Sequence, residues 1–213
     1  MSYANRTRIK FCGMARVEDV RLAAELGVDA VGLIFAPRSP RRLELAQARV
    51  LRAALPPFVT AVALLMDAEI AHVQAILQTV KPALLQFHGA EKPEDCARYG
   101  LPFLKAVPMA IPEGAAIYAA RYPEAIGFVF DSHAAGETGG SGRRFDWSRL
   151  PRGIGRPVLL AGGLDPENVF EAVRSVRPYA VDVSSGIESA PGIKDAKKMR
   201  RFVAEVKRAD ETM

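Results

Sequence analysis

Residues 157–168 read Pro-Val-Leu-Leu-Ala-Gly-Gly-Leu-Asp-Pro-Glu-Asn, a short apolar run followed by a glycine pair and a helix start signal. The run Pro157–Ala161 is uninterrupted, which is typical of a strand buried on both faces of a parallel sheet. Asp165 can accept hydrogen bonds from free N–H groups, Pro166 fits the first helical position, and Glu167 favours the positive end of the helix dipole. This stretch therefore predicts one strand–loop–helix unit of an α/β protein.

The same alternation extends along the whole chain. Ala30–Phe35 is another continuous apolar run. Several intervening stretches repeat apolar residues at helical spacing, which predicts helices that pack one face on a sheet. The segment 133–142 is a Gly-rich loop in which we expect no helix, and only a short helix follows near Trp147. We expect eight strands, which end near Cys12, Ile34, Leu65, Gln86, Ala106, Asp131, Ala161 and Val183.

Eight such units in 213 residues leave two architectures open, an open doubly wound sheet and a closed barrel. No Gly-x-Gly-x-x-Gly follows the first strand and no Gly-Lys-Ser/Thr motif occurs, which removes the usual nucleotide signatures of open sheets. We therefore expect an α/β fold of the (β/α)8 TIM barrel type. Residues 1–213 would form a single domain close to the lower size limit of that fold.

Composition and charge exclude several classes of protein. Hydrophobic residues make up 49% and charged residues 25%, so the chain is not intrinsically disordered. The net charge is +5, and small basic groups occur at 38–42 and 197–201. A nucleic-acid-binding surface would interleave aromatic residues with the basic ones, and the single Trp and five Tyr are not placed in that way. We expect no nucleic-acid partner. The small excess of positive charge instead suits an enzyme that handles an anionic metabolite.

The two cysteines, Cys12 and Cys96, form no disulfide framework or metal-binding knuckle, which points to a reducing compartment. The longest uncharged stretch, Ala53–Met66, contains two prolines and is too short to cross a bilayer. The N-terminus has no apolar segment of the kind found in secretory signals. We therefore expect a cytoplasmic protein without a membrane partner. Three histidines and no clustered carboxylates also argue against a metal site.

In a barrel of this type the active site lies at the carboxyl ends of the strands. Gly162 and Gly163 follow the predicted seventh strand, and Ser184–Gly186 follow the eighth. Glycines let backbone N–H groups approach an anion, and loops seven and eight are the recurrent phosphate site of such barrels. We expect a phosphate site there, although ordinary turns would use glycine as well.

Four titratable side chains fall at other strand ends. A carboxylate at Asp131 costs free energy unless it is paired or faces the barrel mouth, and the alternative is a turn residue. Cys12 is either a proton acceptor or a small buried hydrophobe. His88 suits a hydrogen-bonding role better than a metal-binding one. Lys105 is a Schiff-base candidate or a structural lysine.

Several segments of the chain resemble the phosphoribosylanthranilate isomerase family, and the resemblance runs from Arg8 to Val206. Together and in order these segments are specific, although Phe11 stands where the family usually has Ile. The matching segments are Lys-Phe-Cys-Gly (10–13), Asp-Ala-Val-Gly (29–32), Pro-Arg-Ser-Pro-Arg (37–41), Gln-Phe-His-Gly (86–89), Gly-Gly-Ser-Gly (139–142), Phe-Asp-Trp (145–147), Gly-Gly-Leu-Asp-Pro-Glu-Asn (162–168) and Val-Asp-Val-Ser-Ser-Gly-Ile-Glu (181–188).

The resemblance implies a cofactor-free Amadori rearrangement in tryptophan biosynthesis. It would convert N-(5-phospho-β-D-ribosyl)anthranilate to 1-(2-carboxyphenylamino)-1-deoxy-D-ribulose 5-phosphate. By the family pattern, Asp131 is the general acid that opens the ribose ring and Cys12 is the general base that removes the C2′ proton. Arg41 would meet the anthranilate carboxylate, a contact suited to a guanidinium. The other implied substrate-binding residues are Gln86, His88, Gly162, Gly163, Asp182, Ser184, Ser185 and Gly186.

The phosphosugar substrate is the partner that the resemblance implies, and both a monomer and a homodimer remain open. Two other functions remain as alternatives. One is a different phosphosugar barrel enzyme, such as indole-glycerol-phosphate synthase. That enzyme would need a lysine as general acid and further glutamates at strand ends, and Lys105 is the only such residue that the sequence places there. A non-catalytic phosphate-binding or RNA-binding module would need the aromatic and basic surface that is lacking.

Overall fold

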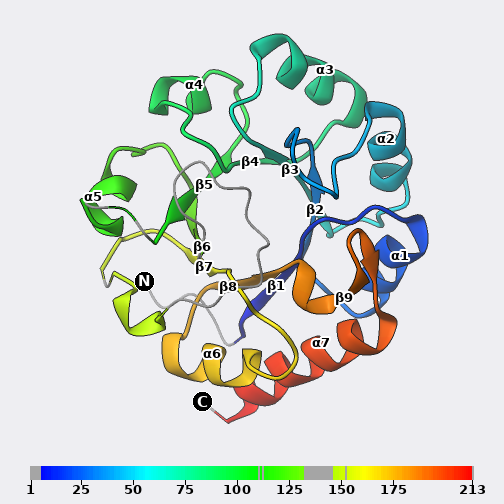
Figure 1. Cartoon of the computed structure of the whole chain (residues 1–213), viewed down its shortest axis with the longest axis vertical. Coiled ribbons are helices and arrows are strands. Elements are labelled where there is room, and N and C mark those ends of the chain that lie inside the picture. The colour runs from blue at the N-terminus through cyan, green and yellow to red at the C-terminus, as the bar shows by residue number, and fades with distance from the viewer. Residues whose placement is uncertain (1–5, 110, 112, 132–145, 152, 213) are drawn as a thin grey trace.

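Eight parallel strands form a closed barrel in which each strand is hydrogen-bonded to the next and β8 pairs with β1 (Figure 1). The computed structural model describes residues 6–109, 111, 113–131, 146–151 and 153–212. The predicted α/β barrel is therefore confirmed. The strands are β1 (Arg8–Phe11), β2 (Ala30–Ile34), β3 (Thr60–Leu65), β4 (Leu84–Phe87), β5 (Phe103–Pro108), β6 (Gly127–Asp131), β7 (Val158–Leu160) and β8 (Ala180–Val183).

Helices surround the barrel and cover its outer face (Figure 1). Within the described part of the chain, none of them has the length and apolar character that a membrane span requires. The α-helices are α1 (Val17–Glu25), α2 (Leu45–Ala53), α3 (Ile70–Val80), α4 (Pro93–Ala97), α5 (Ala115–Ala120), α6 (Val169–Val176) and α7 (Ala196–Glu211). Two 3-10 helices, η1 (Trp147–Arg149) and η2 (Ser185–Ile187), and a hairpin of β9 (Glu188–Ala190) and β10 (Ile193–Lys194) complete the fold.

The strands are mostly apolar because both of their faces are buried, and the polar side chains that they carry, such as Lys10, Lys105 and Asp182, are buried as well. On β5, Leu104 and Ala106 point into the barrel, while Phe103 and Val107 belong to the core between sheet and helices. The same alternation puts Phe11 of β1 in the outer core, edge-on to Phe202 of α7 at 5.9 Å. This double burial explains why continuous apolar runs, not alternating ones, predicted the strands.

Each strand ends within two residues of its predicted position. The short helix expected near Trp147 is η1, whereas the Gly-rich loop 133–142 lies outside the described residues. The helix expected to start at Asp165 begins later, at Val169. The reason is that the Asp165 carboxylate accepts from the N–H groups of Glu167 and Asn168, at 2.8 and 3.0 Å, and so closes a turn ahead of the helix.

Candidate active site

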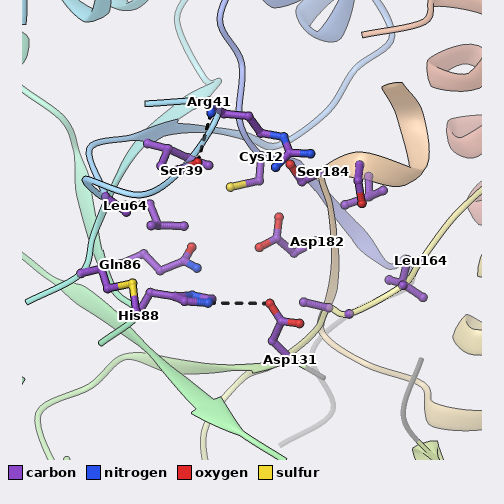
Figure 2. A pocket seen from close by; sticks show the side chains of 18 residues that line it. Cys12, Ser39, Arg41, Leu64, Gln86, His88, Asp131, Leu164, Asp182 and Ser184 are labelled. Atoms are coloured by element: carbon purple, nitrogen blue, oxygen red, sulfur yellow. Dashed lines mark hydrogen bonds and ion pairs between the residues drawn. The ribbon is translucent and has the colours of Figure 1, made fainter. Parts of the chain in front are cut away.

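A pocket of about 680 Å³, part of it open to solvent, lies at the carboxyl ends of the strands (Figure 2). Gly186 is the one expected site residue outside its lining. A Cβ at Gly186 would overlap the carbonyl oxygen of Leu164, so this glycine lets loops seven and eight pack together. The expected residues that do line the pocket are Cys12, Arg41, Gln86, His88, Asp131, Gly162, Gly163, Asp182, Ser184 and Ser185.

Cys12 lies directly after β1 and is buried beside a lysine that also points into the barrel. Lys10 Nζ donates to Asp182 Oδ2 at 2.8 Å. A Cβ at Gly32 would lie 2.5 Å from Cys12 Sγ and 3.2 Å from Lys10 Nζ, so the missing side chain lets the ammonium approach the thiol. Burial raises the pKa of the Cys12 thiol, and the neighbouring ammonium opposes that rise only in part. The resting side chain is therefore a thiol at neutral pH and not a thiolate.

Asp131 ends β6, which is three strands from β1 around the barrel. Figure 2 shows Cys12 and Asp131 at opposite sides of the pocket with Asp182 between them. His88, which follows β4, places Nε2 3.8 Å from Asp131 Oδ2. The arrangement separates a thiol and a carboxyl group across a space that can hold a small molecule.

Three buried polar atoms in the pocket have no hydrogen-bond partner among the described residues. They are Gln86 Oε1, Asp182 Oδ1 and Ser184 Oγ. A buried polar group that makes no hydrogen bond is costly and uncommon in folded proteins. These atoms therefore fit a ligand rich in hydroxyl groups better than an apolar one.

Arg41 is held by a buried carboxylate from the hairpin that follows η2. Its Nε and Nη2 donate to the two oxygens of Glu188, each at 2.7 Å, and Lys194 Nζ donates to Glu188 Oε1 at 2.8 Å. Hydrogen bonds from both cations outweigh burial and lower the pKa of Glu188. Nη1 of Arg41 makes no hydrogen bond with a described residue, so one edge of the guanidinium is available to a ligand.

Loops seven and eight present backbone N–H groups to the pocket. Gly162 and Gly163 have φ of +81° and +65°, the left-handed region that favours glycine. Their N–H groups make no hydrogen bond with the described residues, and Asn168 Nδ2 donates to the carbonyl of Gly163 at 2.8 Å. Ser185 begins η2, where the first N–H groups lack intrahelical partners. Such a set of N–H groups suits an anion.

Apolar side chains line the pocket on the side of β2 and β3. Ile34, Ala36, Leu64 and Met66 form one cluster with Cys12. This wall is what a flat aromatic ring requires. The sequence analysis did not single out these residues, although their positions near the ends of β2 and β3 follow from the barrel.

A sequence model of the family N-(5′phosphoribosyl)anthranilate (PRA) isomerase matches residues 9–205. The N-(5′-phosphoribosyl)anthranilate isomerase of Stenotrophomonas maltophilia (strain R551-3) is 57% identical to the chain over 210 residues, which is 98% of this chain and 96% of the relative. The chain belongs to this family.

Two solved structures of the family share the fold. The phosphoribosyl anthranilate isomerase of Thermus thermophilus has a TM-score of 0.84 and 38% identity, with 95% of this chain and 99% of that chain covered. The second is a phosphoribosyl anthranilate isomerase in complex with reduced 1-(o-carboxyphenylamino)-1-deoxyribulose 5-phosphate, with a TM-score of 0.80, 33% identity and the same coverage.

Two basic residues near predicted strand ends, Arg38 and Lys105, lie away from the pocket. Arg38 is exposed and does not line it. Lys105 is fully buried in the layer between the sheet and the helices, where Nζ lies 3.0 Å from Glu91 Oε2. A synthase that needs a lysine acid at this strand end is therefore not supported. Among the described residues, no group of three or more His, Cys, Asp or Glu could hold a metal ion.

The sequence analysis missed the partners of the expected site residues. These partners are Lys10, Glu188 and Lys194, which are close in sequence to the expected residues. Two of them, Lys10 and Glu188, lie within motifs shared with the family. The Lys10–Asp182 and Arg41–Glu188 pairings arise only when the barrel closes, whereas Lys194 meets Glu188 within the β9–β10 hairpin. A signal was available in the alternation of β1, which puts Lys10 on the same face as Cys12.

Proposed function

We propose that this chain catalyses the Amadori rearrangement of N-(5′-phosphoribosyl)anthranilate in tryptophan biosynthesis. The observation that carries the proposal is the placement of Cys12 and Asp131 on opposite sides of one pocket, in a chain of this family. This rearrangement needs one proton delivered to the ring oxygen of the ribose and another removed from C2′. Two separate groups on opposite sides of the sugar satisfy that requirement.

The reaction begins when Asp131 donates a proton to the ring oxygen of the ribose. The C1′–O bond then breaks, the ring opens, and the amine nitrogen lends its electron pair to form a protonated Schiff base. Cys12 as a thiolate removes the C2′ proton, and the C–H electron pair forms the double bond of an enol-amine. Tautomerisation gives the ketone, so atoms and electrons balance without a cofactor.

Substrate groups match the features of the pocket. The phosphate lies against the N–H groups of Gly162, Gly163 and Ser185, and the ribose hydroxyls meet Asp182, Gln86 and Ser184. The anthranilate ring lies on the wall of Ile34, Ala36, Leu64 and Met66, and its carboxylate takes the open edge of the Arg41 guanidinium. Charge-assisted contacts of this kind fix orientation as well as affinity.

The location and assembly of the enzyme complete the proposal. Its cysteines are both free and buried, in keeping with a reducing cytoplasm. A monomer and a homodimer are both compatible with a pocket built from one chain. Sedimentation equilibrium of the purified protein distinguishes the two states, and fractionation of cells that express it at native level tests the compartment.

Turnover of phosphoribosylanthranilate by the purified chain tests the activity. Asp131→Asn and Cys12→Ser should each lower kcat by at least about 10²-fold, the lower end for general acid–base catalysis. KM should stay within about tenfold, because the binding groups remain. Cys96→Ser is the matched control, since Cys96 is a buried cysteine outside the pocket. Full activity of Cys12→Ser would move the base elsewhere, with His88 the first candidate.

A further inference from the structure

One of the most deeply buried charged side chains of the described residues, that of Lys105, takes no part in the reaction as proposed. Lys105 leaves β5 on the outer side of the barrel and is 0% exposed. Its Nζ donates to the carbonyl oxygens of Phe87 and Gly89, at 3.3 and 2.6 Å, and to Glu91 Oε2 at 3.0 Å. All three acceptors belong to one short segment, the end of β4 and the loop after it.

These contacts bracket His88. Its two chain neighbours, Phe87 and Gly89, give their carbonyl oxygens to the same ammonium. Glu91 closes the segment from the other side, because its Oε1 accepts from the N–H of Gly89 at 3.2 Å and of Asp67 at 2.9 Å. The backbone on both sides of His88 is thereby tied to the loop after β3.

The helices over this segment add neutral groups to the same site. Tyr122, just after α5, donates its hydroxyl to the carbonyl of Glu91 at 2.8 Å. The rings of Tyr118 and Tyr122 lie 5.9 and 5.4 Å from Lys105 Nζ. Burial raises the pKa of Cys96 on α4 to about 12 and also raises that of Tyr122. Both stay protonated at neutral pH, so Glu91 is the anion that Lys105 contacts in the described part of the chain.

His88 needs such support because its contact with the acid depends on small displacements. The 3.8 Å between its Nε2 and Asp131 Oδ2 is compatible with an ion pair but longer than a hydrogen bond. A displacement of about 1 Å at His88 would therefore alter this contact, and a misplacement of that size can cost about 10²-fold in rate. We propose that Lys105 and Glu91 are positioning residues that hold His88 against Asp131 and thereby set proton delivery by that acid. The inference rests on the proposed role of Asp131.

A purely structural role accounts for the pair less well. Taking a lysine and a glutamate out of water is expensive, and a well-packed apolar pair often serves stability as well or better. An apolar pair cannot hold two carbonyl oxygens and two N–H groups at fixed positions. Among the described residues, the hydrogen bonds between the side chains of this pair and the backbone all go to the end of β4 and the loops after β3 and β4.

The test compares variants of the two residues in the whole enzyme. Glu91→Gln keeps an oxygen for the N–H groups of Gly89 and Asp67 but removes the charge that faces Lys105. Lys105→Met removes the ammonium, and Lys105→Met/Glu91→Leu removes both charges in case the single variant does not fold. Each should lower kcat at least about tenfold with KM nearly unchanged, since a displacement far from the chemistry can cost up to about 10²-fold. Arg98→Met is the control, because Arg98 pairs with Asp95 at 2.8 Å on the exposed side of α4.

Two further readouts separate positioning from a general loss of stability. In a His88→Gln background, Glu91→Gln should cause no further fall in kcat, whereas independent effects would multiply. The imidazole NMR signals of His88, assigned by their loss in His88→Gln, should shift in Glu91→Gln. Unchanged kcat and unchanged His88 signals in folded Glu91→Gln would overturn the inference, as would fully multiplying effects. Failure of the wild-type enzyme to turn over phosphoribosylanthranilate would instead overturn the proposed function, because the His88 signals are read without substrate.

Discussion

Cys12 must lose its proton to act as a base, yet its surroundings favour the protonated form. The side chain is 5% exposed, and burial of a thiol disfavours the charged thiolate. Lys10 acts in the opposite direction, because an ammonium beside the sulfur stabilises the thiolate. The balance leaves the pKa of Cys12 raised, so only a small fraction of Cys12 is thiolate at pH 7.

The pH dependence of the reaction follows from this balance. With Cys12 as the proposed base, the active form is the thiolate. Because the pKa of this thiol is raised, kcat/KM should increase with pH through and beyond the ordinary thiol value of about 8.5. Lys10→Met removes the ammonium that stabilises the thiolate, so the rise of kcat/KM should move to still higher pH. The pH dependence of Cys12 alkylation, measured in a Cys96→Ser background, gives the pKa of the Cys12 thiol without substrate. A rate that is level from pH 7 to 9 would exclude Cys12 as the base.

Arg41 tests recognition of the substrate carboxylate. Arg41→Lys keeps a positive charge but loses the planar pair of donors, so we expect a loss of about 1.5–3 kcal/mol in kcat/KM, the value for a hydrogen bond to a charged group. The loss should largely disappear with phosphoribosylaniline, which lacks the carboxylate. Arg38→Lys serves as the control at an exposed position. An equal penalty with both substrates would mean that Arg41 serves only to hold Glu188.

Individual site residues could be predicted from the sequence where a local pattern marks them. Cys12 and Asp131 follow apolar runs, and the barrel rule places the ends of such runs at the mouth. The Lys10–Asp182 and Arg41–Glu188 pairs join residues 172 and 147 positions apart. Their side chains meet through barrel closure, which no local pattern records.

The elements were predictable where burial alone decides them. Continuous apolar runs mark the strands because helices cover one face and the barrel interior the other. The start of α6 was placed too early because Asp165 caps a turn as readily as a helix, and its carboxylate is used for the loop. The role of Asn168 could not be predicted from sequence for a similar reason. Its side chain donates to the carbonyl of Gly163 within the loop, and no repeating pattern indicates that contact.

Loop seven gives a prediction at the scale of an element. Gly163→Ala puts a side chain on a residue with φ of +65°, next to N–H groups that we assign to the phosphate. KM should rise at least about tenfold, the equivalent of one lost hydrogen bond to a charged group. Gly100→Ala is the matched control, because Gly100 has φ of +66° and open space around it. A KM that stays equal to that of Gly100→Ala would show that Gly163 does not contact the phosphate.

The whole barrel closes at the seam between β8 and β1, and charged groups lie on both sides of that seam. Lys10 and Asp182 are directly paired in register across it and form their ion pair inside the barrel. Thr7, ahead of β1, donates both its N–H and its hydroxyl to Asp210 of α7, at 2.9 and 2.7 Å. The two ends of the chain are thereby joined on the inside and on the outside of the sheet.

Removal of one partner of the inner pair should affect the stability of the entire fold. Lys10→Met leaves the Asp182 carboxylate buried without its cation, and we expect a loss of about 3–5 kcal/mol in the free energy of unfolding. Lys10→Met/Asp182→Leu should recover most of that loss, because no buried charge remains. Arg201→Met is the control, since Arg201 and Glu167 form an ion pair with side chains 56% and 64% exposed, worth about 0–1 kcal/mol. Urea unfolding followed by circular dichroism measures all three variants. If Lys10→Met were as stable as Arg201→Met, the seam would be held by its backbone ladder and apolar packing, and the inner ion pair would serve the thiol of Cys12 alone.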